Sequence, residues 1–143
     1  MSPGSTRTGK VLESIVIPAI ASHYIYQKQV PVGQKPDGSP YVADLLLRSR
    51  ASDDTRQILV SLKWQQVPGT AEQKIPFEVI TLIRLLRDKQ IDAAYLVLGG
   101  NGWRPELKRF YLSKELSLYI TDATLVKIVD LNDFIALVNR QAL

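Results

Sequence analysis

The segment over residues 57–66 constrains the fold of this chain more than any other part of the sequence. Its run of aliphatic and β-branched residues predicts a strand, which ends at the turn formed by Val67-Pro68-Gly69. Because side chains alternate along a strand, one face is apolar throughout and consists of Ile58, Val60, Leu62 and Trp64. The other face begins apolar and then becomes polar, in the order Leu59, Ser61, Lys63 and Gln65. An unpaired charge is costly to desolvate, so this strand predicts a partner for its lysine.

Asp44 is the anomaly of the preceding predicted strand, residues 41–47. Aspartate is depleted in strands, and this one is flanked by Val42, Ala43 and three leucines. Such a residue is rarely buried unless it is paired or binds a metal. A polar loop over residues 48–56 predicts that the two strands form an antiparallel pair. The lone aspartate of one strand then lies beside the lone lysine of the next.

The remaining segments predict an α/β fold with a mixed central β-sheet flanked by helices. Helical periodicity or capping patterns occur over residues 9–26 (with a kink at Pro18), 77–89, 106–116 and 131–143. Further strands are predicted over residues 24–32, 93–98 and 125–129. We expect a single domain over residues 9–143, preceded by a flexible N-terminus over residues 1–8 that is rich in Ser, Thr, Gly and Pro.

Composition excludes several classes of function. The chain of 143 residues has no cysteine and one histidine, which argues against thiolate zinc sites, cysteine nucleophiles and a Ser-His-Asp triad. No apolar run approaches the ~20 residues that span a bilayer, and residues 1–10 do not resemble a secretory signal. We therefore expect no membrane partner and a cytoplasmic location. The net charge of +4 mildly favours an anionic partner.

Asp44 and Lys63 together suggest phosphodiester hydrolysis. That reaction needs an activated water and neutralisation of the charge that develops on phosphorus, and a divalent cation held by carboxylates supplies both. Mg²⁺ prefers oxygen ligands and keeps several of its waters. A lysine beside the cation can orient the water or accept its proton. The minimum set is one Asp, a second acid and one Lys, of which the two strands provide the first and last.

The order of these elements resembles the PD-(D/E)XK nuclease superfamily, which includes restriction endonucleases, some homing endonucleases and Holliday-junction resolvases. The similarity runs from a helix with Glu13, through a strand with Asp44 and a strand with Lys63, to a helix and a further strand. It covers about residues 9–98 and implies the restriction-endonuclease-like αβββαβ core. Ala43 stands where proline is common, and Ser61 stands where Glu or Asp is usual.

The resemblance implies that the acid missing at Ser61 is supplied from the following helix. Glu78 lies fifteen positions after Lys63 (78 − 63 = 15) and is the predicted replacement ligand. Glu72 and the amide oxygen of Gln65 are the alternatives. The implied catalytic set is Asp44 and Glu78 holding Mg²⁺, with Mn²⁺ able to substitute, Lys63 positioning the attacking water, and Glu13 assisting a second metal or water.

Each of these residues also has a simpler interpretation. Asp44 could form a structural ion pair with Arg48 or Lys63, and Lys63 could extend its stem to reach water. Glu78 could be a helix-start charge favoured by the helix dipole, and Glu13 a solvated surface carboxylate. Ser61 is not expected to act as a nucleophile, because no histidine base is near and His23 suits a helix end.

Double-stranded DNA is the expected partner. Candidate base contacts follow the lysine strand, and candidate phosphate contacts lie in the basic loops. They are Gln65, Gln66 and Thr70 for bases, and Lys35, Arg48, Arg50, Arg56 and Arg104 for phosphates. Cutting two antiparallel strands is most simply done by a two-fold dimer, so we expect a homodimer or higher homo-oligomer.

The predicted function is a Mg²⁺-dependent DNA endonuclease that leaves 5′-phosphate ends and acts at specific sites, in a restriction-like or homing role. A bacterial or phage-type context fits this role. The alternatives are a Holliday-junction resolvase or DNA-repair nuclease, and a catalytically inactive DNA-binding or assembly module in which Ser61 marks the loss of activity.

Overall fold

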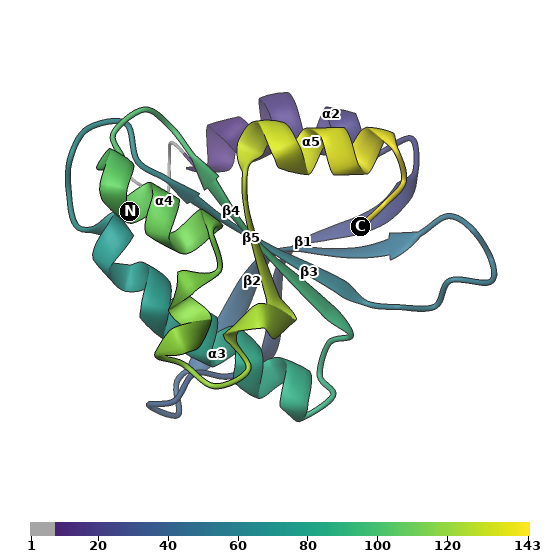
Figure 1. The fold of residues 1–143 in the computed structure, drawn as a ribbon. Coiled ribbons are helices and arrows are strands. Elements are labelled where there is room, and N and C mark those ends of the chain that lie inside the picture. Colours follow the sequence, from purple (N-terminus) through teal and green to yellow (C-terminus); the bar gives the residue numbers. More distant parts are fainter. Residues whose placement is uncertain (1–7) are drawn as a thin grey trace.

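The computed structural model describes residues 8–143 and contains a mixed five-stranded sheet in the order β1-β2-β3-β4-β5 (Figure 1). β1 pairs with β2 and β2 with β3 antiparallel, whereas β3–β4 and β4–β5 are parallel. The strands are β1 (Tyr24–Gln34), β2 (Pro40–Ser49), β3 (Ile58–Trp64), β4 (Ala93–Gly99) and β5 (Val126–Asp130). The predicted α/β class with a mixed central sheet is confirmed.

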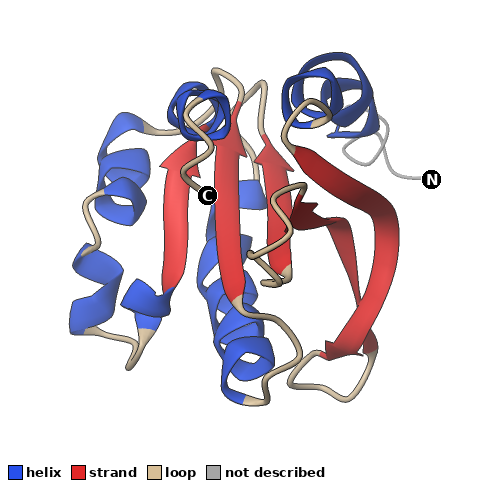
Figure 2. Cartoon of the chain, turned by 90° about the vertical axis from the view of Figure 1, so that its right-hand side faces the viewer, coloured by secondary structure: helices blue, strands red, loops and turns tan. Residues whose placement is uncertain are grey.

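Helices cover both faces of this sheet (Figure 2). One face packs against α3 (Ile75–Arg87), α4 (Pro105–Leu112) and the short helices η3 (Glu115–Leu118) and η4 (Ala123–Leu125). The other face packs against η1 (Leu12–Val16), α2 (Ile17–Ile20) and α5 (Leu131–Asn139). A further short helix, η2 (Ala71–Lys74), leads directly into α3. Within residues 8–143, no helix has the length and apolar character needed to cross a membrane.

β3 lies in the middle of the sheet and contributes to both cores. Leu59 packs into the core below α3, while Ile58, Val60 and Leu62 pack into the core below α2 and α5. Apolar surface is therefore removed from water on both sides of the strand, which explains its nearly continuous apolar sequence. Ser61 is also buried, with 1% of its surface exposed. The polar face predicted for β3 thus begins inside the protein.

The N-terminal helical region is shorter than the sequence predicted. A π-helical turn over η1 is followed by α2, which has Pro18 in its first turn and ends at Ile20, and β1 begins at Tyr24. The backbone stays helical from Thr8 to Ile20, and Pro18 lies in the first turn after the π-helical segment, where its missing N–H is tolerated. The predicted flexible N-terminus lies outside the described residues except for Thr8, which is helical.

The C-terminal helices also end earlier than predicted. α4 stops at Leu112 because Lys114 has a φ of 70°, a left-handed conformation that does not continue a helix. α5 begins as predicted after Asp130, whose side chain accepts a hydrogen bond from the Asp133 backbone N–H at 2.8 Å. It ends at Asn139, and the chain then passes back towards β1, where the Leu143 N–H donates to the Tyr24 hydroxyl.

Candidate active site

The backbone pairing of β2 with β3 covers Leu45 to Leu47 and ends at the Leu45–Val60 pair, so that Asp44, the neighbour of Leu45, has no paired residue in β3. Beyond that point the Asp44 side chain replaces a backbone partner, since its Oδ2 accepts a hydrogen bond from the Leu62 N–H at 2.8 Å. The antiparallel strands therefore carry Asp44 to β3, as the sequence predicted. The open end of this ladder is where the candidate site forms.

β2 turns about its own axis at Asp44. Tyr41 packs into the core on the α3 side, whereas Leu45 packs into the core on the other side, although both lie at odd positions of one strand. In β1, Lys28 pairs with Leu45 and Val30 with Ala43, which leaves Gln29 opposite Asp44 with a φ of 52°. A positive φ in a non-glycine strand residue marks a local distortion. This distortion brings both Tyr41 and Asp44 towards β3 and α3.

Burial raises the pKa of the Asp44 carboxyl above its ordinary value. The Leu62 N–H and the nearby Lys63 ammonium act in the opposite direction, and the Glu78 carboxylate adds to the rise. Asp44, Lys63 and Glu78 thus interact electrostatically in one partly buried site, which lies between β2, β3 and the start of α3 and is called the corner below.

Glu78 reaches this corner from the first turn of α3. The helix predicted over residues 77–89 begins at Ile75 with Pro76 in its first turn, and a carboxylate is favourable near that helix end. The Glu78 side chain is 12% exposed, and its Oε1 lies 3.8 Å from the Lys63 Nζ. The acid predicted to replace the one missing at Ser61 is therefore beside the lysine.

Two hydroxyl groups hold the other oxygen of Glu78. Tyr41 Oη and Ser61 Oγ each donate a hydrogen bond to Oε2 at 2.7 Å. Burial raises the pKa of the Tyr41 hydroxyl, and the adjacent Glu78 charge raises it further, so the tyrosine keeps the proton that it donates. Sequence reasoning did not select Tyr41. The only signal in the sequence is that a buried tyrosine hydroxyl requires a polar partner.

The two carboxylates share a pattern that suits a hard cation. One oxygen of each is anchored, Oδ2 of Asp44 by the Leu62 N–H and Oε2 of Glu78 by two hydroxyls. Within residues 8–143, the opposite oxygen of each accepts no hydrogen bond from protein, and no group of three or more His, Cys, Asp or Glu gathers in one place. Mg²⁺ keeps several waters and binds through one or two carboxylates, so this pair fits it.

The other predicted site residues, Glu72, Gln65 and Glu13, contact protein groups other than Asp44, Lys63 and Glu78. Glu72 is fully buried, with its Oε1 2.9 Å from Arg104 Nε and its Oε2 accepting from the Arg104 backbone N–H at 3.1 Å. Gln65 is also buried, and its Nε2 donates to the Gly102 carbonyl at 2.9 Å, whereas its amide oxygen, the predicted ligand atom, accepts no hydrogen bond among the described residues. Glu13 is exposed and pairs with Lys28 at 2.6 Å. In these contacts Glu72 and Gln65 link segments of the fold, and Glu13 is a surface carboxylate, which was its simpler interpretation.

The loops that follow β3 and β4 are joined at the carboxyl ends of these parallel strands. The Gln65 N–H donates to the Gly99 carbonyl at 3.0 Å, and the Gly102 N–H donates to the Gln65 carbonyl at 2.8 Å. Gly100 has a φ of 93°, and a Cβ there would lie 2.3 Å from the Gln65 carbonyl oxygen. Only glycine allows the backbone at position 100 to come this close to Gln65. Gln66 is exposed at the surface of these two joined loops.

The candidate DNA-contact residues differ in their surroundings. Arg50 donates from Nε to the Ala21 carbonyl, Arg104 pairs with Glu72, and Arg56 pairs with Asp54. Lys35 is half-buried. The exposed candidates with no such side-chain contact among the described residues are Gln66, Thr70 and Arg48.

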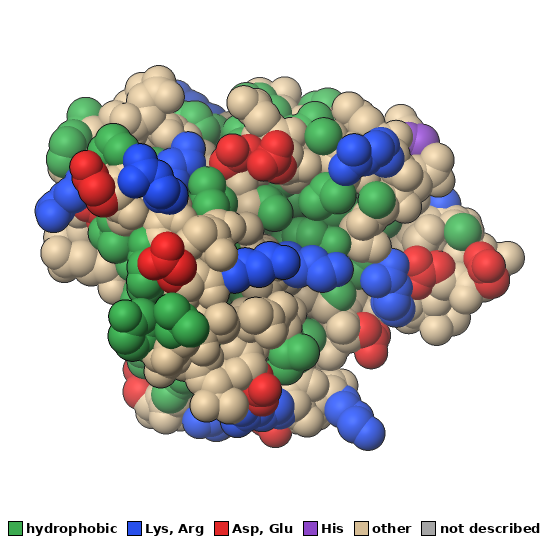
Figure 3. Space-filling model, in the orientation of Figure 1, with side chains coloured by type: hydrophobic (Ala, Val, Ile, Leu, Met, Phe, Trp, Pro, Cys, Tyr) green, Lys and Arg blue, Asp and Glu red, His purple; other side chains and the backbone are tan. Residues whose placement is uncertain are grey.

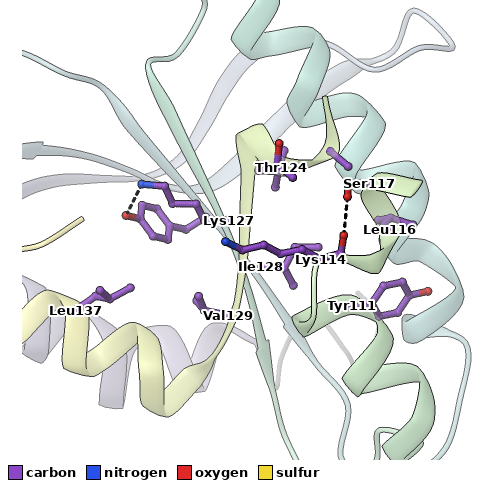
Figure 4. Close-up of a pocket in the computed structure, with 12 residues that line it drawn as sticks. Tyr111, Lys114, Leu116, Ser117, Thr124, Lys127, Ile128, Val129 and Leu137 are labelled. Carbon is purple, nitrogen blue, oxygen red and sulfur yellow. Dashed lines mark hydrogen bonds between the residues drawn. The ribbon is translucent and has the colours of Figure 1, made fainter. Parts of the chain in front are cut away.

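A cavity of about 260 Å³ lies along β5, away from Asp44 and Glu78 (Figure 4). Lys127 extends across it with its Nζ 5.2 Å from the centre of the Tyr95 ring, and Lys114 reaches into it from the segment after α4. Figure 3 shows basic side chains over this region beside a hydrophobic hollow. None of the residues of the candidate active site lines this cavity.

Comparisons with known proteins identify the family of this chain. A family model described as a PD-(D/E)XK nuclease superfamily domain matches residues 4–142. Among solved structures, the small subunit of the heterodimeric restriction endonuclease R.BspD6I is similar, with a TM-score of 0.41 and 14% identity over 92% of this chain and 73% of that chain. A search of curated protein sequences finds no match. Since the family model spans nearly the whole chain, this protein belongs to the PD-(D/E)XK nuclease superfamily.

Proposed function

We propose that this protein is a Mg²⁺-dependent DNA endonuclease whose active site consists of Asp44, Glu78 and Lys63. The observation that carries the proposal is the position of Glu78. Its carboxylate extends from α3, lies beside Lys63 and accepts a hydrogen bond from the Ser61 hydroxyl. The acid absent from β3 is thereby supplied from the next helix. Asp44 and Glu78 would hold Mg²⁺, and Mn²⁺ would substitute for it.

The protein's own groups have distinct roles in this proposal. A bound Mg²⁺ would activate water and offset charge on the scissile phosphate. The Lys63 side chain is 32% exposed, and its ammonium lies beside Glu78, where it can orient the attacking water and stabilise negative charge on the phosphate. Products with 5′-phosphate and 3′-hydroxyl ends follow from the family resemblance. Glu13, which pairs with Lys28, has no step assigned to it.

Double-stranded DNA is the proposed substrate. Gln66 and Thr70 are exposed on the segment that follows Lys63, where an amide can contact adenine and a threonine methyl can contact thymine. Arg48 is exposed at the end of β2 and suits a phosphate. Two copies related by a two-fold axis would cut both strands. Restriction, homing, junction-resolving and repair roles share this chemistry.

One observation favours a second candidate, an inactive DNA-binding or assembly module. Only two carboxylates meet at the site among the described residues, and the Lys63–Glu78 contact balances one of their charges without a metal. In that case the corner would be an ion-pair network that stabilises the fold.

Cleavage of supercoiled plasmid in Mg²⁺ or Mn²⁺ separates the two candidates. The wild-type protein should nick or cut the plasmid, and Lys63→Ala should lower the rate by about a thousandfold, as expected when charge stabilisation and proton transfer are lost. Lys28→Ala, which removes an exposed surface lysine, is the matched control. Normal cleavage by Lys63→Ala would refute the site. A folded wild type that cuts neither plasmid nor branched DNA would favour the inactive module.

A further inference from the structure

We propose that Tyr41 and Ser61 are positioning residues that orient the Glu78 carboxylate, so that its Oε1 faces Lys63 and the metal position. Neither residue is a metal ligand in this proposal. The inference rests on the proposed function, because it assigns a purpose to two hydroxyls of the same site. It also explains why serine occupies the position where the superfamily usually has an acid.

The geometry shows that both hydroxyls act on one atom. Tyr41 reaches Oε2 from β2 and Ser61 reaches it from β3, each at 2.7 Å. A carboxylate oxygen has two lone-pair sites, so two donors fill Oε2. Oε1 is then the oxygen of Glu78 that is left for a cation. Lys63 Nζ lies 3.8 Å from Oε1, which is too far for a hydrogen bond.

The donors suit a carboxylate that must stay ionised and accessible. Both are neutral, so they stabilise the charge of Glu78 by hydrogen bonding without neutralising it as an arginine would. Both are also buried, Tyr41 with 4% and Ser61 with 1% of its surface exposed, so their positions are set by packing. β3 anchors both acids of the site, Glu78 through the Ser61 hydroxyl and Asp44 through the Leu62 N–H.

Ser61 and Glu78 therefore form a matched pair. An acid at position 61 would place a second carboxylate against Glu78, and like charges at that distance repel. A hydroxyl at position 61 instead supports the acid that comes from the helix. In this interpretation Ser61 marks a relocated ligand.

Mn²⁺ binding to the intact protein without DNA, measured by isothermal titration calorimetry, tests this inference. Tyr41→Phe and Ser61→Ala should each weaken Mn²⁺ binding about tenfold, as expected for losing one hydrogen bond to a charged group. Ser61→Thr keeps the hydroxyl and should retain near wild-type affinity. Tyr111→Phe is the matched control, since that buried hydroxyl donates at 2.6 Å to the Glu72 carbonyl, and it should leave Mn²⁺ affinity unchanged.

Glu78→Gln distinguishes the failure of this inference from the failure of the proposed function. If Glu78→Gln binds Mn²⁺ as well as wild type, the metal assignment of the proposed function is wrong. If Glu78→Gln loses binding while Tyr41→Phe and Ser61→Ala keep it, the function stands and the positioning role is refuted. Equal weakening by Tyr111→Phe would also refute it, because the effect would then be one of general stability. Should Tyr41→Phe fail to fold, the Ser61→Ala and Ser61→Thr pair decides the question.

Discussion

Two acids, the buried Glu72 and the partly buried Glu78, lie six positions apart (78 − 72 = 6) and have opposite surroundings. Glu72 is fully buried, and Arg104 contacts both of its oxygens, one through the guanidinium and one through the backbone N–H. Glu78 keeps 12% of its side chain exposed, and its one ion pair within residues 8–143 is with Lys63 at 3.8 Å. Glu72 joins two loops, whereas Glu78 retains an oxygen that faces the site.

The difference shows what makes a buried carboxylate available for chemistry. Glu72 has a cation within direct contact, so its charge is already balanced. Glu78 is held by two neutral hydroxyls and keeps its charge for a further partner. In the sequence both residues were candidates to replace the acid missing at Ser61. The geometry supports Glu78 as the proposed ligand and Glu72 as a structural residue.

The largest expected effect comes from comparing Glu78→Gln with Glu72→Gln. Glu78→Gln should lower plasmid cleavage in Mg²⁺ by about a thousandfold, which corresponds to roughly 4 kcal/mol of lost transition-state stabilisation. Glu72→Gln should keep most of the cleavage rate and instead lower the free energy of unfolding by about 1–2 kcal/mol. Cleavage rates and urea unfolding of both variants measure this. Loss of cleavage in folded Glu72→Gln would reverse the assignment.

Arg104→Leu tests whether the ion pair with Arg104 balances the charge of Glu72. It leaves the Glu72 carboxylate buried without its cation, so the free energy of unfolding should fall by about 3 kcal/mol in urea unfolding. Combining it with Glu72→Leu removes the stranded charge and should recover much of the loss. A stability loss that the second substitution does not reduce would show that Arg104 acts through other contacts.

Exchanging the acid between helix and strand sharpens the comparison further. Ser61→Glu combined with Glu78→Gln moves the carboxylate to the position that the superfamily usually uses. We expect Mn²⁺ binding about tenfold tighter than in Glu78→Gln alone, because a second charged ligand is restored. Ser61→Gln with Glu78→Gln, which adds bulk without charge, is the control and should show no gain.

The smallest expected effect is on the free energy of unfolding of the metal-free protein, which Asp44→Asn should change in a pH-dependent way. Burial raises the folded-state pKa of Asp44, so the folded protein binds this proton more tightly than the unfolded chain does. Ionised Asp44 therefore opposes folding, and its penalty develops as the pH rises from the ordinary aspartate range through the raised pKa. Without metal, Asp44→Asn should resist urea better than wild type at pH 7, with the difference shrinking towards pH 4. A difference independent of pH would contradict this charge effect.

Most of the sheet and the elements that carry Asp44, Lys63 and Glu78 could be predicted from local sequence. Alternation and strand order located Asp44 and Lys63 on neighbouring strands, and the pattern over residues 77–89 located the helix that carries Glu78. Tyr41 could not be found in this way. It lies three positions before Asp44, so regular alternation places the two on opposite faces. The distortion opposite Gln29, with its φ of 52°, brings both to the site, and nothing in the local sequence predicts it.

The sequence alone determined the α/β class, the order of the strands along the chain and the family, because these depend on periodicity, turn residues and spacing over short segments. The tertiary structure decided which of the two acids after β3 reaches Lys63 and which is paired with Arg104. The physical reason is that a carboxylate's role depends on the donors that surround it. Those donors come from β2, β3 and the loop after β4, segments that meet only when the chain is folded.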